Sequence, residues 1–413
     1  MVGGLISATA DEIGIGDLEE RQMDRKIKFG FWNYIESGAL RKDAVADWKE
    51  MRFDLPMSFT FDERKHDKKD MLDVLDECEK FGMKLIICDR RTHFRTLIAE
   101  GAEKFTAGVK QAYTDFGKHS ATFGFFVGDE PTPAETDVFI EAVKIVMNET
   151  HRLTPFANLV PYWGGGSDFD MLAGANACEH TAIVEKLLKE TQIPLIGYDQ
   201  YTQCLDDNYN TECGINSYFY VLDQYCALAG KHKIPFYATL LACGHWSFKT
   251  PSEEDIRWQI YTALAHGARG ILWFHLYGYE AGSSYAGNPM ILCGNEVLKT
   301  PLYDAILRQQ AIFNAYYREQ FDKMELISVY HTGHIYDPKK RFCADDILLD
   351  VNGKFSYPTI ISYYKEYDTG KKWMSVVNAH KRHANKITLK YQSGLEESFW
   401  LACGEMKLIR IDE

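Results

Sequence analysis

Three acidic residues stand in two short motifs that could carry acid–base chemistry. Asp129 and Glu130 are adjacent in the motif GDEP at 128–131, and Asp199 lies in the motif YDQY at 198–201. Cleavage of a glycosidic bond needs one carboxylic acid to protonate the leaving oxygen and a carboxylate to meet the positive charge that develops on the sugar. We therefore expect Glu130 to be the general acid and Asp199 or Asp129 to be the second carboxylate.

The residues near these acids are of types that bind sugars. Flat Trp and Tyr rings stack on the apolar C–H face of a pyranose, while amides, imidazoles and charged groups bind its hydroxyls. We expect both histidines in this set to bind hydroxyls or to be structural rather than catalytic. The expected substrate-binding residues are Trp32, Asn33, Asp89, Arg90, Asn158, Tyr162, Trp163, Tyr198, Tyr201, His245, Trp246, Trp273, His275 and Tyr277.

Each candidate also has a structural interpretation that the sequence leaves open. The adjacent acids could be solvated at a strand end, and Asp199 could bond to backbone or to an arginine. Asn33 and Asn158 could cap loops, and the tryptophans could belong to the core. Around the acid pair, we expect Gly128 to leave room for a substrate and Pro131 to keep the chain extended as it leaves its strand.

Eight repeats of a short apolar run followed by an amphipathic stretch would position these residues. Short runs rich in β-branched and aromatic residues are typical of buried parallel strands. The runs lie at 27–34, 53–61, 85–89, 123–127, 156–160, 194–198, 235–241 and 270–276. Eight strand–helix units in this order predict a (β/α)8 TIM barrel with a core at about 27–320, in a domain at 1–322. In such barrels the active site lies where the strands end, which is where most of the candidates fall.

Three helix starts share one signal. Thr132, Thr250 and Thr300 are each followed by proline, which suits an N-cap with proline at the first helical position. Glu135 and Glu253 stand three residues after their threonines and complete two capping boxes. We expect helices to begin at all three positions.

From about residue 323 the pattern changes to alternating polar and apolar residues. The segments ELISVYH, FSYPTIISYYKEY, KWMSVVNAH, NKITLKY and FWLACGEMKLIRI are separated by turns rich in Gly, Asp and Lys. This pattern predicts a C-terminal antiparallel β-sheet or sandwich domain at 323–413. Since no low-complexity linker precedes it, we expect a fixed interface with the barrel.

Composition limits the classes of partner. The 413 residues carry 46 Lys and Arg against 59 Asp and Glu, a formal charge of −13, which offers no electrostatic footprint for nucleic acid or an anionic membrane. No apolar run approaches the ~20 residues of a membrane span. The ten scattered cysteines show no metal-binding spacing and suit buried free thiols. A cytoplasmic location is favoured, with a secreted or periplasmic one if a leader was removed. The sequence is silent on oligomeric state.

The GDEP motif resembles a known signature. It looks like the Asn-Glu-Pro acid/base motif of the clan A glycoside hydrolases, with Asp129 in the place of Asn and Glu130 matching the acid/base. The longer stretch 123–277, with its DEP, NL-P and YDxY motifs and its closing helix and strand, resembles a group of bacterial glycoside hydrolases. This resemblance implies a clan A-like barrel that cleaves a carbohydrate and needs no cofactor or metal.

One feature departs from that pattern. Clan A enzymes carry a nucleophilic Glu at the end of strand 7, whereas the seventh run here, YATLLACGHW, holds no acid. In one interpretation Asp199 is the nucleophile or base opposite Glu130. In the other, the adjacent pair resembles the Asp-Glu pair of substrate-assisted hexosaminidases (families 20 and 123), with Asp129 orienting an acetamido group and a tyrosine at 198 or 201 assisting. Carboxyl groups ~5–5.5 Å apart imply a nucleophile, and ~6.5–9.5 Å an activated water. Glu280 is a further loop candidate.

Two other functions remain open. A metal-dependent barrel hydrolase could use Asp129, Glu130, Asp199, His245 and His275 as ligands, although the first and sixth runs lack the HxH and Lys that many metal barrels carry. A non-catalytic glycan-binding protein would explain the missing acid of strand 7. A barrel alone does not choose among these functions.

Overall fold

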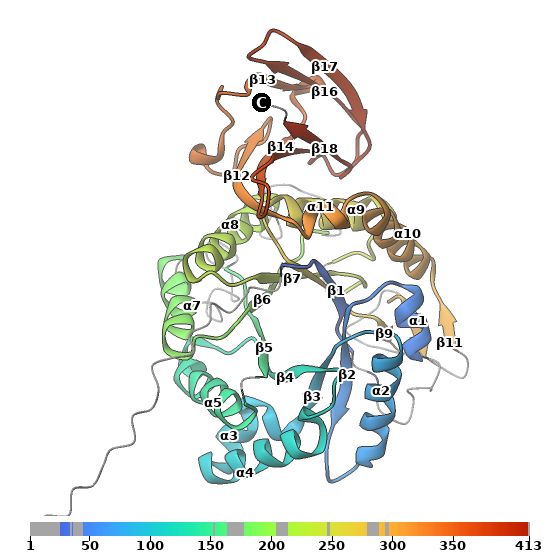
Figure 1. Cartoon of the computed structure of the whole chain (residues 1–413), viewed down its shortest axis with the longest axis vertical. Helices are drawn as coiled ribbons and strands as arrows, with labels where there is room; N and C mark the ends of the chain where they lie inside the picture. The colour runs from blue at the N-terminus through green and yellow to red at the C-terminus, as the bar shows by residue number, and fades with distance from the viewer. Residues whose placement is uncertain are drawn as a thin grey trace, which may run out of the picture.

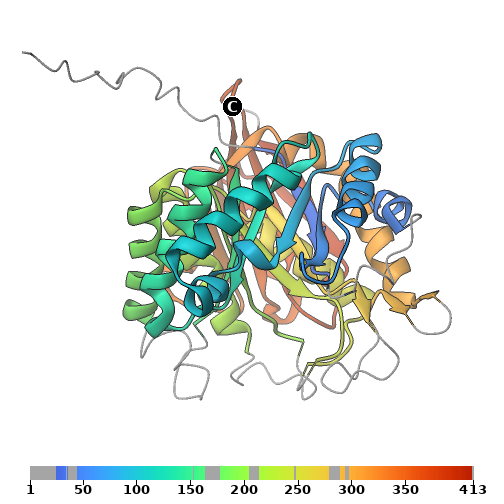
Figure 2. The same ribbon diagram turned by 90° about the horizontal axis from the view of Figure 1, so that it is seen from below.

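The computed structural model describes residues 25–33, 35, 44–151, 153–162, 177–203, 214–245, 248–278, 289–293 and 297–411. Eight parallel strands close into a barrel, with β1 paired to both β2 and β8, and helices stand around it (Figures 1 and 2). The predicted TIM barrel is therefore confirmed. The barrel strands are β1 (Lys28–Phe31), β2 (Leu55–Phe61), β3 (Leu85–Asp89), β4 (Thr122–Asp129), β5 (Thr154–Leu159), β6 (Ile196–Asp199), β7 (Phe236–Leu241) and β8 (Gly270–Phe274).

The surrounding helices bury apolar faces against the outside of the barrel. They are α1 (Ala44–Glu50), α2 (Lys68–Lys80), α3 (Phe94–Glu100), α4 (Ala102–Ala112), α5 (Thr136–Glu149), α7 (Ala177–Thr191), α8 (Ile215–His232), α9 (Glu253–Ala265), α10 (Pro301–Tyr316) and α11 (Arg318–Phe321). After β8 the chain adds a small sheet of β9 (Tyr277–Gly278), β10 (Ile291–Cys293) and β11 (Val297–Lys299). Among the described residues, no helix is long and apolar enough to cross a membrane.

Alternate residues of β3, β7 and β8 belong to two different apolar layers. Ile271 and Trp273 of β8 pack outward beneath the helices, while Leu272 and Phe274 point into the barrel. A strand buried on both faces is a continuous apolar run, which is why the sequence reveals it. Because such a run has no alternation of polar and apolar residues, it does not indicate which of its residues face the barrel interior.

The predicted helix starts are correct at two positions and wrong at one. Thr132 and Glu135 form the expected capping box, at a 3-10 turn that leads into α5. Thr300 stands at the N-cap position of α10 and is followed by proline, although its side chain makes no capping bond. The cap of α9 is instead Ser252, which forms its box with Asp255, so Thr250 does not start that helix. The backbone N–H of the preceding Lys249 donates to the Gln203 carbonyl at 2.8 Å, which ties this segment to the loop after β6.

The C-terminal region forms two antiparallel sheets that pack face to face. One has the order β12-β14-β15-β18, the other β13-β16-β17, and an apolar core lies between them. The predicted sandwich is therefore confirmed, although the boundary at 322/323 stays a prediction. The strands are β12 (Met324–Thr332), β13 (Leu348–Gly353), β14 (Thr359–Glu366), β15 (Lys372–Asn378), β16 (Asn385–Tyr391), β17 (Glu396–Leu401) and β18 (Met406–Ile411).

The sandwich packs on the α8–α9 side of the barrel (Figure 1). The Trp258 indole of α9 donates to the Ala379 carbonyl at 2.8 Å, and the Arg257 guanidinium donates to the Cys403 carbonyl at 2.6 Å. Apolar residues of β12, β14 and β15 share one core with the barrel helices. These contacts agree with the expected fixed interface.

None of the eight described cysteines forms a disulfide. Five are buried and Cys226 is half-buried, as expected of free thiols, but Cys178 and Cys343 are exposed. The expectation of burial is therefore wrong for these two.

Candidate active site

The ends of β4, β5 and β6 bring two of the acids to one amide. Asn158 of β5 lies between Asp129, the last residue of β4, and Asp199, the last residue of β6. Its Nδ2 donates to Asp129 Oδ1 at 3.0 Å and to Asp199 Oδ1 at 2.8 Å. Its own Oδ1 accepts a hydrogen bond from Thr239 of β7 at 3.4 Å. Asn158 therefore bridges the two aspartates rather than capping a loop.

Glu130 turns back over this pair. Its backbone adopts a left-handed φ of 44°, and its N–H donates to the Asn158 carbonyl at 2.9 Å. Its carboxyl group forms a hydrogen bond with the carboxyl group of Asp199. The expected extended chain before Pro131 is therefore wrong. A non-glycine residue in this region is conformationally costly, and strain of this kind recurs at active sites.

The glycine of the GDEP motif has a packing role instead of the expected one. A Cβ atom on Gly128 would lie 2.3 Å from a ring carbon of Phe94 and 3.3 Å from Phe139. Both rings belong to the outer layer under α3 and α5. Gly128 thus makes room for a core phenylalanine, and the expectation that it makes room for substrate is not met.

Burial raises the pKa of all three acids, and the two aspartates raise the pKa of Glu130 further. The charge of Asp199, burial, and the charge of Asp129 together raise the pKa of Glu130 to about 9. Burial and the charge of Asp199 raise the pKa of Asp129 to about 7. Burial raises the pKa of Asp199 to about 6, against hydrogen bonds from Asn158, Tyr201 and Glu130 that lower it. Like charges that cannot all ionise share protons in this way.

The hydrogen bonds and the pKa values together rank how tightly the three acids hold a proton. The Asn158 amide is a donor to both aspartates, so each presents an acceptor oxygen to it. Glu130 has the highest pKa of the three and forms a hydrogen bond with Asp199, so Glu130 is the acid of the cluster that holds a proton most tightly at neutral pH. A protonated carboxylic acid beside an ionised carboxylate is the arrangement that a general acid needs.

Aromatic residues line the barrel interior around the acids. Trp32 packs edge-on against Phe126, with ring centroids 5.3 Å apart, and its indole donates to Thr239 Oγ1 at 3.3 Å. Tyr201 bonds to Asp199 and packs 5.7 Å from Phe274, and the His245 ring lies 5.5 Å from the same phenylalanine. Of the residues predicted to bind substrate, Trp32, Asn158, Tyr201 and His245 thus lie in or beside this interior.

Three of the residues predicted to bind substrate point away from the barrel interior, so the prediction is wrong for them. Tyr198 stacks on Tyr225 of α8 with centroids 4.1 Å apart, and the Trp273 indole donates to Gln310 of α10. The hydroxyl of Tyr277 accepts a hydrogen bond from the Trp48 indole of α1 at 2.7 Å. All three belong to the layer between strands and helices. Trp273 of β8 is one residue out of phase with the inward Leu272 and Phe274.

Three other predicted residues have structural partners near the site. Asn33 Oδ1 accepts the backbone N–H of Ile35 at 2.8 Å, so this asparagine does cap a loop. The His275 Nδ1 bonds to the carbonyl of Tyr277 and therefore carries a proton. Tyr162 packs 6.4 Å from the His180 ring of α7.

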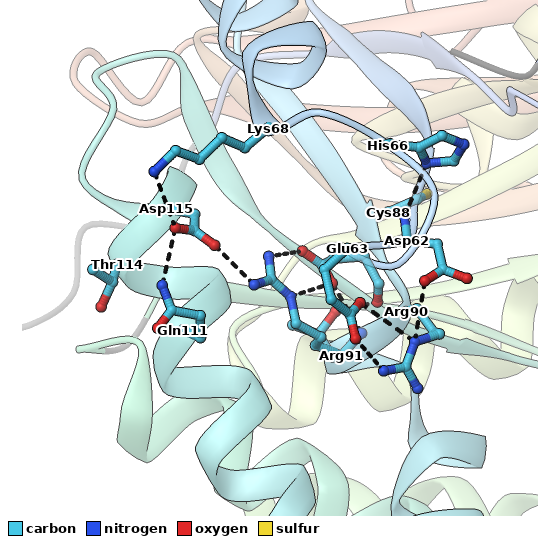
Figure 3. A network of polar contacts seen from close by, with 12 residues as sticks. Asp62, Glu63, His66, Lys68, Cys88, Arg90, Arg91, Gln111, Thr114 and Asp115 are labelled. Carbon is cyan, nitrogen blue, oxygen red and sulfur yellow. Dashed lines mark hydrogen bonds and ion pairs between the residues drawn. The ribbon is translucent and has the colours of Figure 1, made fainter. Parts of the chain in front are cut away.

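Asp89 and Arg90 belong to an ion-pair network at the ends of β2 and β3, which we call the rim network (Figure 3). The Arg91 guanidinium lies 2.7 Å from Asp89 and 2.8 Å from Asp115. Arg90 pairs with Glu63 and, at 2.6 Å, with Glu100. Each arginine is thus engaged by acids of the protein. The network consists of Asp62, Glu63, Arg64, Asp89, Arg90, Arg91, Glu100 and Asp115.

Two predicted site residues, Trp163 and Trp246, lie outside the described residues, as does Glu280. Conversely, the sequence prediction missed Thr239, although it stands two residues before the inward-facing Leu241 at the end of β7. A polar residue with the parity of the interior was the available signal.

The metal interpretation receives no support from the geometry of the candidate ligands. Among the described residues, one group of three has ligand atoms all within 4.8 Å of one another, namely Asp76, Glu79 and His119. It lies at the surface, on α2 and a neighbouring turn. The acids and histidines of the barrel interior form no such group.

Comparisons with known proteins find similar folds among solved structures. No family model matches the chain, and no curated protein matches its sequence. A GH42 β-galactosidase from G. stearothermophilus is 9% identical with a TM-score of 0.65, over 94% of this chain and 98% of that one. A β-galactosidase from the psychrophilic Marinomonas ef1 is 10% identical with a TM-score of 0.53, over 72% of this chain and 62% of that one.

The β-galactosidase of the haloarchaeon Halorubrum lacusprofundi gives a third likeness, at 12% identity and a TM-score of 0.51, over 70% of this chain and 58% of that one. The chain spans about three fifths of the length of the Marinomonas and Halorubrum enzymes. At these identities the likeness concerns the fold. The chain shares an eight-stranded barrel with these glycoside hydrolases.

Proposed function

We propose that the chain is a glycosidase in which Glu130 is the general acid. The single observation that carries this proposal is the buried carboxyl cluster, in which two neighbouring acids keep Glu130 protonated at neutral pH. Holding three acids together in a protein interior is unfavourable, and strongly perturbed groups of this kind concentrate at catalytic sites. The fold of the structural neighbours supports the same reaction class.

The contact between Glu130 and Asp199 bears on the choice of second carboxylate. A nucleophile and a general acid lie on opposite sides of the sugar, with carboxyl groups ~5–5.5 Å apart in retaining enzymes. Glu130 and Asp199 instead form a hydrogen bond with each other, which brings their carboxyl groups closer together than that spacing. We therefore favour the scheme in which the substrate supplies its own nucleophile.

In that scheme the 2-acetamido oxygen of an N-acetylhexosaminide attacks C1 as the C1–O bond breaks, and the proton of Glu130 goes to the leaving oxygen. Asp129, held by Asn158, orients the acetamido N–H. Asp199, held by Asn158 and Tyr201, keeps the proton on Glu130 before the reaction. Water then opens the cyclic intermediate, and its proton returns to Glu130.

A panel of nitrophenyl α- and β-glycosides, with and without a 2-acetamido group, tests the proposal. Glu130→Gln should lower kcat by at least ~100-fold, because a positioned general acid contributes that much. Glu141→Gln, at an exposed position of α5, is the matched control and should leave kcat unchanged. Hydrolysis should survive EDTA.

The outcomes separate the alternatives. A requirement for the acetamido group supports the substrate-assisted scheme, whereas hydrolysis of plain hexosides would make Asp199 the nucleophile or base. Wild-type hydrolysis by Glu130→Gln would contradict the assignment of the acid. Activity abolished by EDTA would favour the metal-dependent alternative.

A further inference from the structure

The C-terminal sandwich exposes two large aromatic side chains at one end. Phe355, in the turn between β13 and β14, is 73% exposed, and Trp400 of β17 is 57% exposed. The ammonium group of Lys354 lies 4.8 Å from the centre of the first ring and 5.4 Å from the centre of the second. The two rings therefore flank one lysine and form a single surface feature.

The backbone holds Phe355 outward at a cost. Phe355 has a φ of 58° and the following Ser356 a φ of 57°, both in the left-handed region that bulky residues avoid. Burial of the phenyl ring does not offset this cost, because most of the ring is exposed. Strained, exposed aromatic residues of this kind are expected where a ligand is held.

These residues lie at the end of the sandwich next to the barrel mouth. The mouth is the face of the barrel at which its eight strands end. Tyr357 has its ring 5.7 Å from Phe355 and stacks 5.6 Å from His383, in the loop between β15 and β16. In the same loop, Lys381 donates to the carbonyl of Thr202, three residues after Asp199. A line of rings thus runs from the outer sheet toward the loop that follows β6.

The sheet behind Trp400 is polar rather than apolar. Lys386 stands across from Trp400, and the hydroxyls of Thr388 and Ser398 lie 2.8 Å apart on the same outer face. A protein-binding surface would be expected to have a contiguous apolar centre. Separate rings set among hydroxyl, amide and ammonium groups suit a sugar chain, which presents apolar faces ringed by hydroxyls.

We propose that this surface, the aromatic ridge of Lys354, Phe355, Tyr357, His383 and Trp400, binds a carbohydrate chain that extends from the barrel mouth. The inference rests on the proposed glycosidase function and narrows its substrate to a polysaccharide or long oligosaccharide. The rings of Phe355 and Trp400 stack on sugar faces, and Lys354 binds hydroxyls between them.

Native affinity electrophoresis of the full chain tests the ridge without any need for turnover. The gels contain glycol chitin, galactan, xylan or mucin glycopeptide. At least one of these should retard the wild type, and the double variant Phe355→Ala/Trp400→Ala should weaken that binding by about tenfold or more, as loss of central aromatic contacts does. Tyr316→Ala, at an equally exposed ring on α10, is the control and should bind as the wild type does.

The two proposals fail in different ways. Glu130→Gln should keep full retardation, because the ridge lies apart from the acids. Retardation of the double variant equal to that of the wild type, or no retardation of the wild type in any gel, would overturn the ridge. The double variant should hydrolyse nitrophenyl glycosides at the wild-type rate, which would show that its active site is intact. A failure of the proposed catalysis would appear in this hydrolysis assay and not in the gels.

Discussion

Two groups of acids at the barrel edge have opposite electrostatic surroundings. In the rim network each acid faces an arginine. Asp62 lies 2.6 Å from Arg64, and the hydrogen bond from that guanidinium holds the pKa of Asp62 well below its usual range. In the described part of the chain, no lysine or arginine forms an ion pair with Asp129, Glu130 or Asp199. Their pKa values rise instead.

The comparison separates a structural cluster of acids from a catalytic one. Burial alone does not decide, because Asp89 of the rim is also buried and its pKa is raised even though Arg91 opposes the shift. The difference lies in the counter-charges. Arginines fix the rim acids as carboxylates, whereas an amide and a second carboxylate leave the proton of Glu130 available for transfer.

The largest expected effect comes from breaking the rim. Arg91→Met removes the cation between Asp89 and Asp115 and leaves a buried acid unpaired, so the free energy of unfolding should fall by about 3–5 kcal/mol. Denaturant unfolding measures this loss. Arg64→Met, at an exposed arginine, is the control and should change stability little. Equal losses in the two variants would show that the rim is not held by its buried pair.

The second effect concerns how stability depends on pH. The pKa of Glu130 is about 9 in the folded chain against 4.5 in the unfolded chain, so the folded state binds the proton more tightly. Its contribution to stability is complete below pH 4.5 and is lost as pH rises through 9. Between pH 6 and pH 9 this one group should lower the free energy of unfolding by about 1.4 kcal/mol per pH unit.

Glu130→Gln isolates that contribution, because glutamine does not titrate. Urea unfolding of both proteins at pH 6, 7, 8 and 9 should give a steeper decline for the wild type. Parallel curves would mean that Glu130 already ionises at its ordinary pKa in the folded state.

A smaller effect is expected from Asn158→Leu, which removes the bridge between the two aspartates. Misplacement of the acids should lower kcat/KM by about 10- to 100-fold. Because the Asn158 hydrogen bonds lower the pKa of both aspartates, their loss should also shift the acidic limb of the pH profile to higher pH. Asn148→Leu, on the exposed face of α5, serves as the control. An unshifted limb would assign Asn158 a merely structural role.

Most of the fold could be predicted because burial on both faces of a strand leaves a continuous apolar run. The run at 85–89 coincides with β3, and the other seven differ from their strands only at the ends. The start of α9 could not be predicted, because Thr250 and Ser252 both offer a cap. In the structure the cap is Ser252, and the segment before it is bonded through the Lys249 N–H to the carbonyl of Gln203, which lies far away in sequence.

The site could be predicted only to the level of strand ends. The motifs locate the three acids at strand ends, and parallel barrel strands all end at the same face of the barrel. Which aromatic ring faces inward depends on strand parity: Trp273 points to the helices and its neighbour Phe274 to the interior. The left-handed backbone of Glu130 and its contact with Asp199 are tertiary features that no local pattern encodes.

A measurement of the pKa of Glu130 is the most direct test of whether this residue holds a proton at neutral pH and can act as the general acid. Carbon-13 NMR of chain labelled at the glutamate carboxyl carbon, titrated beside Glu130→Gln to assign the missing resonance, measures it. We expect this carboxyl group to keep its proton through neutral pH and to ionise at about 9. Ionisation near pH 4.5 would contradict it, since Glu130 would then hold no proton to donate.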